Sequence, residues 1–213
     1  MILENKLNIT DAVELARVEE KLSKAKAHKL FTSGFLDSLD AGGFQALADI
    51  HLYLFGDIYD FAGKLRTVNM AKGNFRFAPV MYLKAALDNI ETMPHSSFDE
   101  IIEKYVEMNI AHPFREGNGR STRIWLDLIL KQELKQVVDW SQVDKDDYLL
   151  AMERSPIKDI EINVLLKQAL TDKINDSAIY MKGIDASYHY EGYTLYKTEE
   201  CEKNNEKDSE DES

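Results

Sequence analysis

Apolar residues recur at spacings of three and four along most of the chain, with short polar breaks between the repeats. This is the period of helices that bury one face. The segments that show it are 10–33, 44–59, 80–93, 97–110, 141–153 and 159–170. Thr10-Asp11 supplies a cap for the first segment, and Ser97 with Glu100 has the order of a capping box. The pattern predicts an all-α fold and places the polar residues 21–29 on an exposed face.

One segment departs from the helical period. Residues 67–79 place a Gly73-Asn74 turn between two short alternating stretches, which is the signal of a β-hairpin. A histidine also interrupts an apolar helical face, because His51 lies among the buried positions of segment 44–59. We expect it to be a hydrogen-bonded core residue rather than a ligand.

A glycine-rich turn follows the fourth helical segment. Pro113 cannot continue that helix, so His112 is expected at a rigid helix end, with Phe114 plugged into the core. Gly117-Asn118-Gly119 is then expected to form the turn at which a further helix begins. The exposed N–H groups of this turn and of the helix N-terminus would form a binding site for an anion. The buried stripe of this helix is expected to be Trp125, Leu128 and Ile129.

The same stretch carries charged groups that suit a polyphosphate. Arg120 and Arg123 are three apart and share a helical face, and guanidinium groups bond phosphate oxygens bidentately. Glu116 is placed to hold a Mg²⁺ ion on the phosphates, and His112 can accept a proton near neutral pH. Taken singly, these would be a buried helix-end histidine, a helix N-terminal carboxylate and two solvated arginines. Their combination at this spacing favours a nucleotide site.

Composition disfavours nucleic-acid-binding, membrane-spanning and secreted proteins. The 213 residues are 44% hydrophobic and 30% charged, with a net charge of −12, which disfavours nucleic-acid wrapping. No apolar run is long enough to span a bilayer, and the N-terminus lacks the pattern of a secretory signal. The lone Cys201 is consistent with a reducing, cytoplasmic compartment. Residues 197–213 carry eight acids and three lysines, and we expect a disordered tail there.

The central stretch resembles the Fic family signature, H-x-F-x-[D/E]-G-N-G-R-x-x-R, at every defined position. Residues 50–66 also resemble the N-terminal half of the Fic core. The resemblance implies a helical bundle around a central motif helix with a small β-hairpin flap, occupying residues 1–196. The defined positions are His112, Phe114, Glu116, Gly117, Asn118, Gly119, Arg120 and Arg123.

The resemblance further implies transfer of AMP from ATP to a Tyr, Ser or Thr hydroxyl of a target protein. His112 would be the catalytic base and Glu116 would hold Mg²⁺. The 67–79 hairpin would clamp the target, and segment 141–153 would be a wall for the adenine. The candidate ATP-binding residues are Lys72, Asn109, Gly117, Asn118, Gly119, Arg120 and Arg123.

The last predicted helix, about 178–192, ends in Ser187-x-x-x-Glu191-Gly192. This resembles the inhibitory motif [S/T]-x-x-x-E-[G/N] of Fic proteins, in the class that carries it on a C-terminal helix (class III). Glu191 would then pair with Arg123 and misplace the triphosphate. Tyr188, near Glu191, is expected at the mouth of the cleft and is a candidate for self-modification, whereas His189 is expected to be a surface or packing residue.

Other functions remain open at this point. A kinase of the Doc type is disfavoured, because this chain has Gly119 and Arg123 where such kinases have lysine and lack the second arginine. Removal of AMP from a modified protein, a bifunctional enzyme, and a non-catalytic regulatory or binding module are the alternatives. Homo-oligomers are plausible, and neither nucleic acid nor membrane is expected as a partner.

Overall fold

The structure, a computed structural model, describes residues 2–72 and 75–191, with the side chain of Glu191 excepted. These residues form eight α-helices, two short 3-10 helices and four two-residue strands, so the prediction of a helical fold is confirmed. The helices are α1 Ala12–Thr32, α2 Phe44–Phe55, α3 Val80–Thr92, α4 Phe98–Ala111, α5 Asn118–Leu134, α6 Lys145–Arg154, α7 Ile160–Gln168 and α8 Ser177–Glu191, with 3-10 helices η1 Leu36–Ser38 and η2 Trp140–Gln142.

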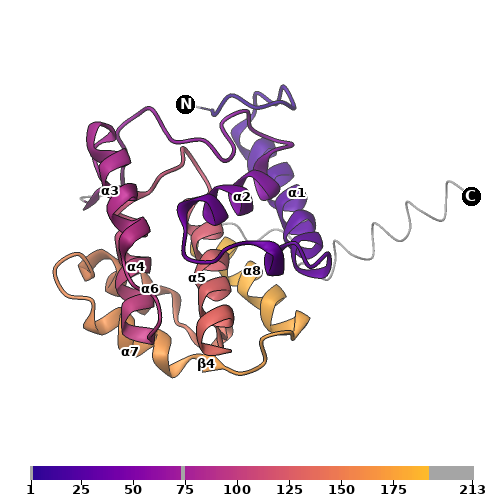
Figure 1. Ribbon diagram of the computed structural model, residues 1–213. Helices are drawn as coiled ribbons and strands as arrows, with labels where there is room; N and C mark the ends of the chain where they lie inside the picture. Colours follow the sequence, from indigo (N-terminus) through magenta and orange to yellow (C-terminus); the bar gives the residue numbers. More distant parts are fainter. Residues whose placement is uncertain (1, 73–74, 192–213) are drawn as a thin grey trace, which may run out of the picture.

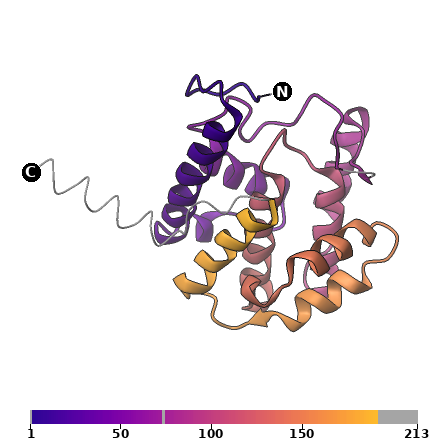
Figure 2. The same cartoon turned by 180° about the vertical axis from the view of Figure 1, so that it is seen from behind.

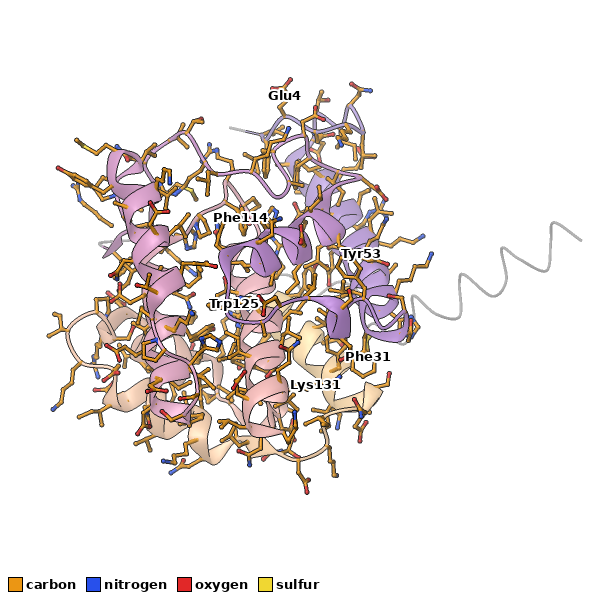
Figure 3. All side chains as sticks on the ribbon, viewed as in Figure 1. Glu4, Phe31, Tyr53, Phe114, Trp125 and Lys131 are labelled. Carbon is orange, nitrogen blue, oxygen red and sulfur yellow. The ribbon has the colours of Figure 1, made fainter. Side chains whose placement is uncertain are left out.

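Helix α5 lies at the centre, with α2, α4 and α8 packed around it (Figure 1). Its side chains are buried on nearly every side, as expected of a helix enclosed by others. Trp125 is fully buried and donates a hydrogen bond from Nε1 to the carbonyl of Gly43 at 3.1 Å. Figure 3 labels Trp125 along α5 and Phe114 above the N-terminal end of this helix. The predicted buried stripe is confirmed by Trp125, Leu128 and Ile129.

Helix α8 packs between α1 and α5, where Figure 2 shows it crossing in front of α5 beside α1. Near its start, the ring of Tyr180 stacks on Phe31 of α1 with centroids 4.6 Å apart. Further along, Gly183 lies against the ring of Trp140 in η2. Helix α8 is therefore docked on the body of the fold. Gly192 and the expected tail, residues 197–213, lie outside the described residues.

Helix α1 is less exposed than its sequence predicts. Residues 21–29 were expected on a solvated face, but Lys24 is buried and its Nζ lies 2.9 Å from carboxylates of both Glu20 and Asp185. The second of these belongs to α8, so this ion pair ties the two helices together. The expectation is therefore wrong for Lys24, because a partner helix brings a carboxylate to it, and for Ser23, which is also buried.

Two small two-stranded antiparallel sheets complete the fold. The predicted hairpin pairs β1 (Ala71–Lys72) with β2 (Phe75–Arg76); residues 73–74, between the two strands, are not described. The other sheet pairs β3 (Val137–Val138) with β4 (Leu170–Thr171) and was not predicted from the sequence. Within the described part of the chain, no helix is long and apolar enough to cross a membrane.

Candidate active site

The loop between α4 and α5 is closed by its own side chains. Asn118 is buried, accepts a hydrogen bond from the amide of Phe114 and donates one to the carbonyl of the same residue, both at 2.8 Å. Gly117 has a φ of +75°, and a Cβ there would lie 2.5 Å from Cε2 of Phe55. Only glycine meets both conditions. The asparagine and glycine of the motif therefore fix the shape of the loop.

The loop begins at His112, which has a left-handed backbone, with φ 48° and ψ 62°, and ends α4. This conformation is uncommon for a residue other than glycine. Arg66 holds it in place: its Nε donates to the carbonyl of His112 at 2.7 Å and its Nη2 to that of Ala111 at 3.1 Å. The same guanidinium reaches the carbonyls of Val68 and Ala78 on either side of the hairpin. One arginine thus joins the catalytic candidate to the base of the flap.

The imidazole of His112 lies flat on the ring of Phe77, with centroids 3.6 Å apart and planes inclined by 16°. Burial, with a further contribution from the positive charge of Arg66, lowers the pKa of His112 to about 3. The side chain is therefore neutral at physiological pH. A neutral imidazole is the form that can accept a proton.

His51, on α2, holds the same loop in place through hydrogen bonds. The amide of Gly63 donates to Nδ1 of His51 at 2.9 Å, so Nε2 carries the proton and donates to the carbonyl of Glu116 at 2.7 Å. Burial lowers the pKa of His51 to about 4, which keeps this neutral tautomer. The predicted role of a hydrogen-bonded core histidine is confirmed.

Glu116 presents the loop's carboxylate. Its Oε1 accepts hydrogen bonds from the amide of Gly117 and from Nη2 of Arg120, both at 2.9 Å, while its side chain remains 37% exposed. Within residues 2–72 and 75–190, no three His, Cys, Asp or Glu side chains gather as a metal-binding group. Mg²⁺ commonly takes one or two carboxylates and completes its shell with phosphates and water. A single oriented, accessible carboxylate therefore fits a Mg²⁺ ion that arrives with a nucleotide.

The two motif arginines have different surroundings. Arg120 is only 2% exposed and bridges Glu116 to Glu19, a buried carboxylate on α1. Arg123 lies over the rings of Trp140, Tyr148 and Tyr190, at 5.7, 5.1 and 4.8 Å from their centroids. These contacts are consistent with cation–π attraction. Direct contact of either arginine with phosphate remains a prediction.

Helix α8 reaches both arginines through its tyrosines. The ring of Tyr188 lies 5.1 Å from the guanidinium of Arg120, and its hydroxyl shares a hydrogen bond with Ser23 of α1. The hydroxyl of Tyr190 donates to the carbonyl of Val143 at 2.7 Å. Tyr188 is therefore buried beneath α8, rather than at the cleft mouth where the sequence placed it, so its self-modification requires α8 to move.

The remaining predicted residues are less closely joined to the site. Lys72 is exposed on β1, and its charge still contributes to lowering the pKa of His112. Asn109 is half-buried and donates to the carbonyl of Tyr105 at 2.8 Å. Ser187 is buried on α8, and His189 is exposed. The side chain of Glu191 lies outside the described residues, so its pairing with Arg123 stays a prediction.

Three residues that touch the site were missed from the sequence: Glu19, Arg66 and Phe77. Glu19 had a signal, because Leu15, Glu19, Ser23 and Ala27 follow one another at four-residue spacing and all are buried. A carboxylate on that apolar stripe requires a buried cation as partner. Arg66 and Phe77 lie in irregular segments, where no periodicity indicates which side chains turn inward.

Residues 42–130 match the sequence model of the Fic/DOC family. This stretch contains α2 to the larger part of α5, including the hairpin and the whole loop described above. Over this stretch the chain is similar to the Fic/DOC family, as the motif predicts.

Curated relatives cover much more of the chain. This chain is 29% identical over 166 residues to the probable protein adenylyltransferase y4lH of Sinorhizobium fredii. The aligned region covers 72% of this chain and 83% of that protein. This chain is 25% identical to the probable protein adenylyltransferase Fic of Salmonella typhimurium, with coverages of 80% and 88%. The protein adenylyltransferase VbhT of Bartonella schoenbuchensis is 26% identical and covers 91% of this chain, but the chain spans only 45% of VbhT.

Solved structures show the same fold. The AMPPNP-bound BepC protein of Bartonella tribocorum has a TM-score of 0.64 at 19% identity, covering 80% of this chain and 93% of that one. The N-terminal Fic domain of a Bep effector from Bartonella sp. AR 15-3 has a TM-score of 0.65 at 17% identity, with coverages of 80% and 88%.

Proposed function

We propose that this chain is a protein adenylyltransferase, which transfers AMP from ATP to a Tyr, Ser or Thr hydroxyl of a target protein. The observation that carries the proposal is a neutral His112, fixed at a helix end between the flap and the loop of Glu116. The relatives named protein adenylyltransferase support the reaction class. The AMPPNP bound to BepC supports an adenine nucleotide as the substrate.

In the proposed reaction, the target hydroxyl oxygen attacks the α-phosphorus of ATP. A new P–O bond forms to the target, the bond from the α-phosphorus to the oxygen bridging to the β-phosphorus breaks, and pyrophosphate leaves with that electron pair. His112 takes the hydroxyl proton. The entering phosphates carry negative charge, which raises the pKa of the imidazole from its value in the free enzyme and strengthens it as a base.

The surrounding residues would position the reactants. Glu116 would hold the Mg²⁺ ion, which offsets charge on the phosphates when bound. The amides of Gly117 to Gly119, at the N-terminus of α5, would meet the developing charge. Arg123 would orient the terminal phosphates, with Lys72 and Asn109 as further candidates for contact with the nucleotide. Catalysis then rests on positioning and electrostatics, as in other phosphoryl transfers.

The target would dock on the flap. Among the described residues, β1 pairs with β2 alone, which leaves the hairpin able to accept an extended target segment by strand addition. Large apolar side chains beside it are open to solvent: Val68 is 41% exposed, and Met81 and Tyr82, at the start of α3, are 78% and 58% exposed. A hydrophobic contact next to the strand pairing would add affinity for the target.

Helix α8 would restrain the enzyme. Glu191 at its end would compete with the γ-phosphate for Arg123. The tyrosine contacts to both arginines support this role, because α8 cannot stay docked without covering them. De-AMPylation is the second candidate activity, in which the same Glu191 would align a water molecule.

Parallel incubation with α-labelled and γ-labelled ATP tests the reaction class. The Glu191→Gly variant should retain label on protein from the α-phosphate only, and the additional change His112→Ala should abolish it while leaving nucleotide binding. Label retained from γ alone would indicate a kinase and refute the proposal. Loss of label from a pre-labelled target, without any forward transfer, would favour de-AMPylation.

A further inference from the structure

A carboxylate outside the matched family region touches the motif. Glu19 lies on α1, ahead of residues 42–130, and is 3% exposed. One of its oxygens accepts a hydrogen bond from Nη1 of Arg120, and the other accepts one from the hydroxyl of Tyr59. Burial, together with the charge of Glu19, raises the pKa of Tyr59, so this hydroxyl stays protonated as a donor. Both carboxylate oxygens of Glu19 are thus engaged.

Arg120 is divided between two carboxylates. Its Nη1 goes to Glu19 and its Nη2 goes to Oε1 of Glu116. The ring of Phe55 covers the guanidinium at 4.8 Å, and the ring of Tyr188 lies at 5.1 Å. A guanidinium held in this way has little freedom to rotate. It therefore fixes the oxygen of Glu116 that also receives the amide of Gly117.

The summed charge of these side chains determines how strongly Glu116 attracts a cation. Glu19, Arg120 and Glu116 together carry a charge of −1, so the accessible carboxylate still attracts a cation. Without the charge of Glu19, Arg120 and Glu116 would sum to zero, and the guanidinium would be free to take both oxygens of Glu116 in a bidentate pair. The metal-binding carboxylate would then be neutralised by its own neighbour.

We infer that Glu19 is a positioning residue for the metal carboxylate, acting through Arg120. The inference rests on the proposed nucleotide-dependent function, because the Mg²⁺ ion that Glu116 would hold arrives with the phosphates of a nucleotide. Residues that orient a metal ligand commonly change metal affinity by about 10- to 100-fold when replaced. A helix outside the matched domain would thereby set the affinity of the site for its metal.

The test measures metal and nucleotide separately on the full chain. Mn²⁺, which is visible by electron paramagnetic resonance, replaces Mg²⁺, and AMPPNP replaces ATP. Glu19→Gln should weaken Mn²⁺ binding to the AMPPNP complex by about tenfold and leave metal-free AMPPNP binding unchanged or tighter, since Arg120 loses a counter-charge. A merely structural role would weaken both. Equal Mn²⁺ affinity in Glu19→Gln and wild type would overturn the inference.

Glu20→Gln is the matched control. Glu20 is the next residue of α1, is equally buried and forms an ion pair with Lys24. Its Mn²⁺ affinity should match wild type, and a loss equal to that of Glu19→Gln would overturn the inference. If thermal melting shows Glu19→Gln unfolded, Tyr59→Phe takes its place, with a weakening of about threefold expected and no change as the refuting result. Failure of wild type to bind AMPPNP at all would instead sink the proposed function.

Discussion

The docking of α8 can be loosened at a single position. Gly183 faces the ring of Trp140, and a Cβ added there would lie 2.9 Å from Cδ1, about 0.5 Å inside ordinary contact. The ring cannot turn away easily. Its Nε1 donates to Oδ2 of Asp127 at 2.9 Å, its edge meets Tyr148, and Arg123 lies over it. In Gly183→Ala, α8 itself must therefore shift.

The magnitude follows from overpacking. Inserting a methyl group into a packed contact costs about 1–3 kcal/mol, and alanine returns about 0.5–1 kcal/mol by favouring the helix. A net change of about 0.5–2 kcal/mol would raise the undocked population of α8 by about 2- to 30-fold. If only the undocked form transfers AMP, the rate should rise by the same factor.

The assay is the initial rate of protein labelling from α-labelled ATP. Lys182→Ala is the control, because Lys182 is the preceding residue of α8 and is exposed. Its rate should equal that of wild type. A Gly183→Ala protein that is folded, shows a loosened α8 by hydrogen exchange and labels no faster than wild type would refute the claim that docked α8 restrains catalysis.

Three further predictions concern titration and backbone strain. Because the pKa of His112 is about 3, kcat/KM should be flat between pH 6 and 8; an ordinary histidine would lose roughly three quarters of the activity by pH 6, and such a loss would contradict the assignment. Burial raises the pKa of Asp127 from 3.8 to about 7. Its contribution to stability is therefore full below pH 3.8 and is lost as the pH rises through about 7, so the unfolding free energy of wild type minus that of Asp127→Asn should fall on the order of 3 kcal/mol between pH 4 and 7. A constant difference in chemical denaturation would count against it. In Gly117→Ala the new Cβ would clash with Phe55, and the backbone φ of +75° is strained for alanine. In Gly34→Ala the φ of +72° is equally strained, but no described atom lies within 4 Å of the new Cβ. The first should lose about 2–4 kcal/mol and the second about 1 kcal/mol, and equal melting temperatures would show that contact with Phe55 is unimportant.

The helices and the family could be predicted from the sequence because both depend on local patterns. The period of three and four placed α3 and α4 closely and gave the start of α2, although α2 ends at Phe55 and not at residue 59. The order of Ser97 and Glu100 gave the capping box that the structure forms. The motif from His112 to Arg123 indicated the family from eight defined positions, and the matched region 42–130 agrees with it. The curated relatives agree with the predicted nucleotidyltransferase class.

What the sequence did not show depends on contacts between distant segments. Glu19 meets Arg120 across 101 positions, and Tyr188 meets Ser23 across 165. The spacing along α1 could indicate that Glu19 is buried, but no local pattern identifies the partner in either pairing. The pairing of β3 with β4 was missed for a related reason, since two-residue strands are too short to show alternation. The left-handed backbone of His112 also depends on Arg66, which lies 46 positions away.

The most direct test of the central claim is a crystal structure of the chain soaked with AMPPNP and Mg²⁺. We expect the triphosphate on the amides at the N-terminus of α5, the metal on Glu116, and the α-phosphate facing the imidazole of His112. A nucleotide bound elsewhere, with this loop empty, would contradict the account.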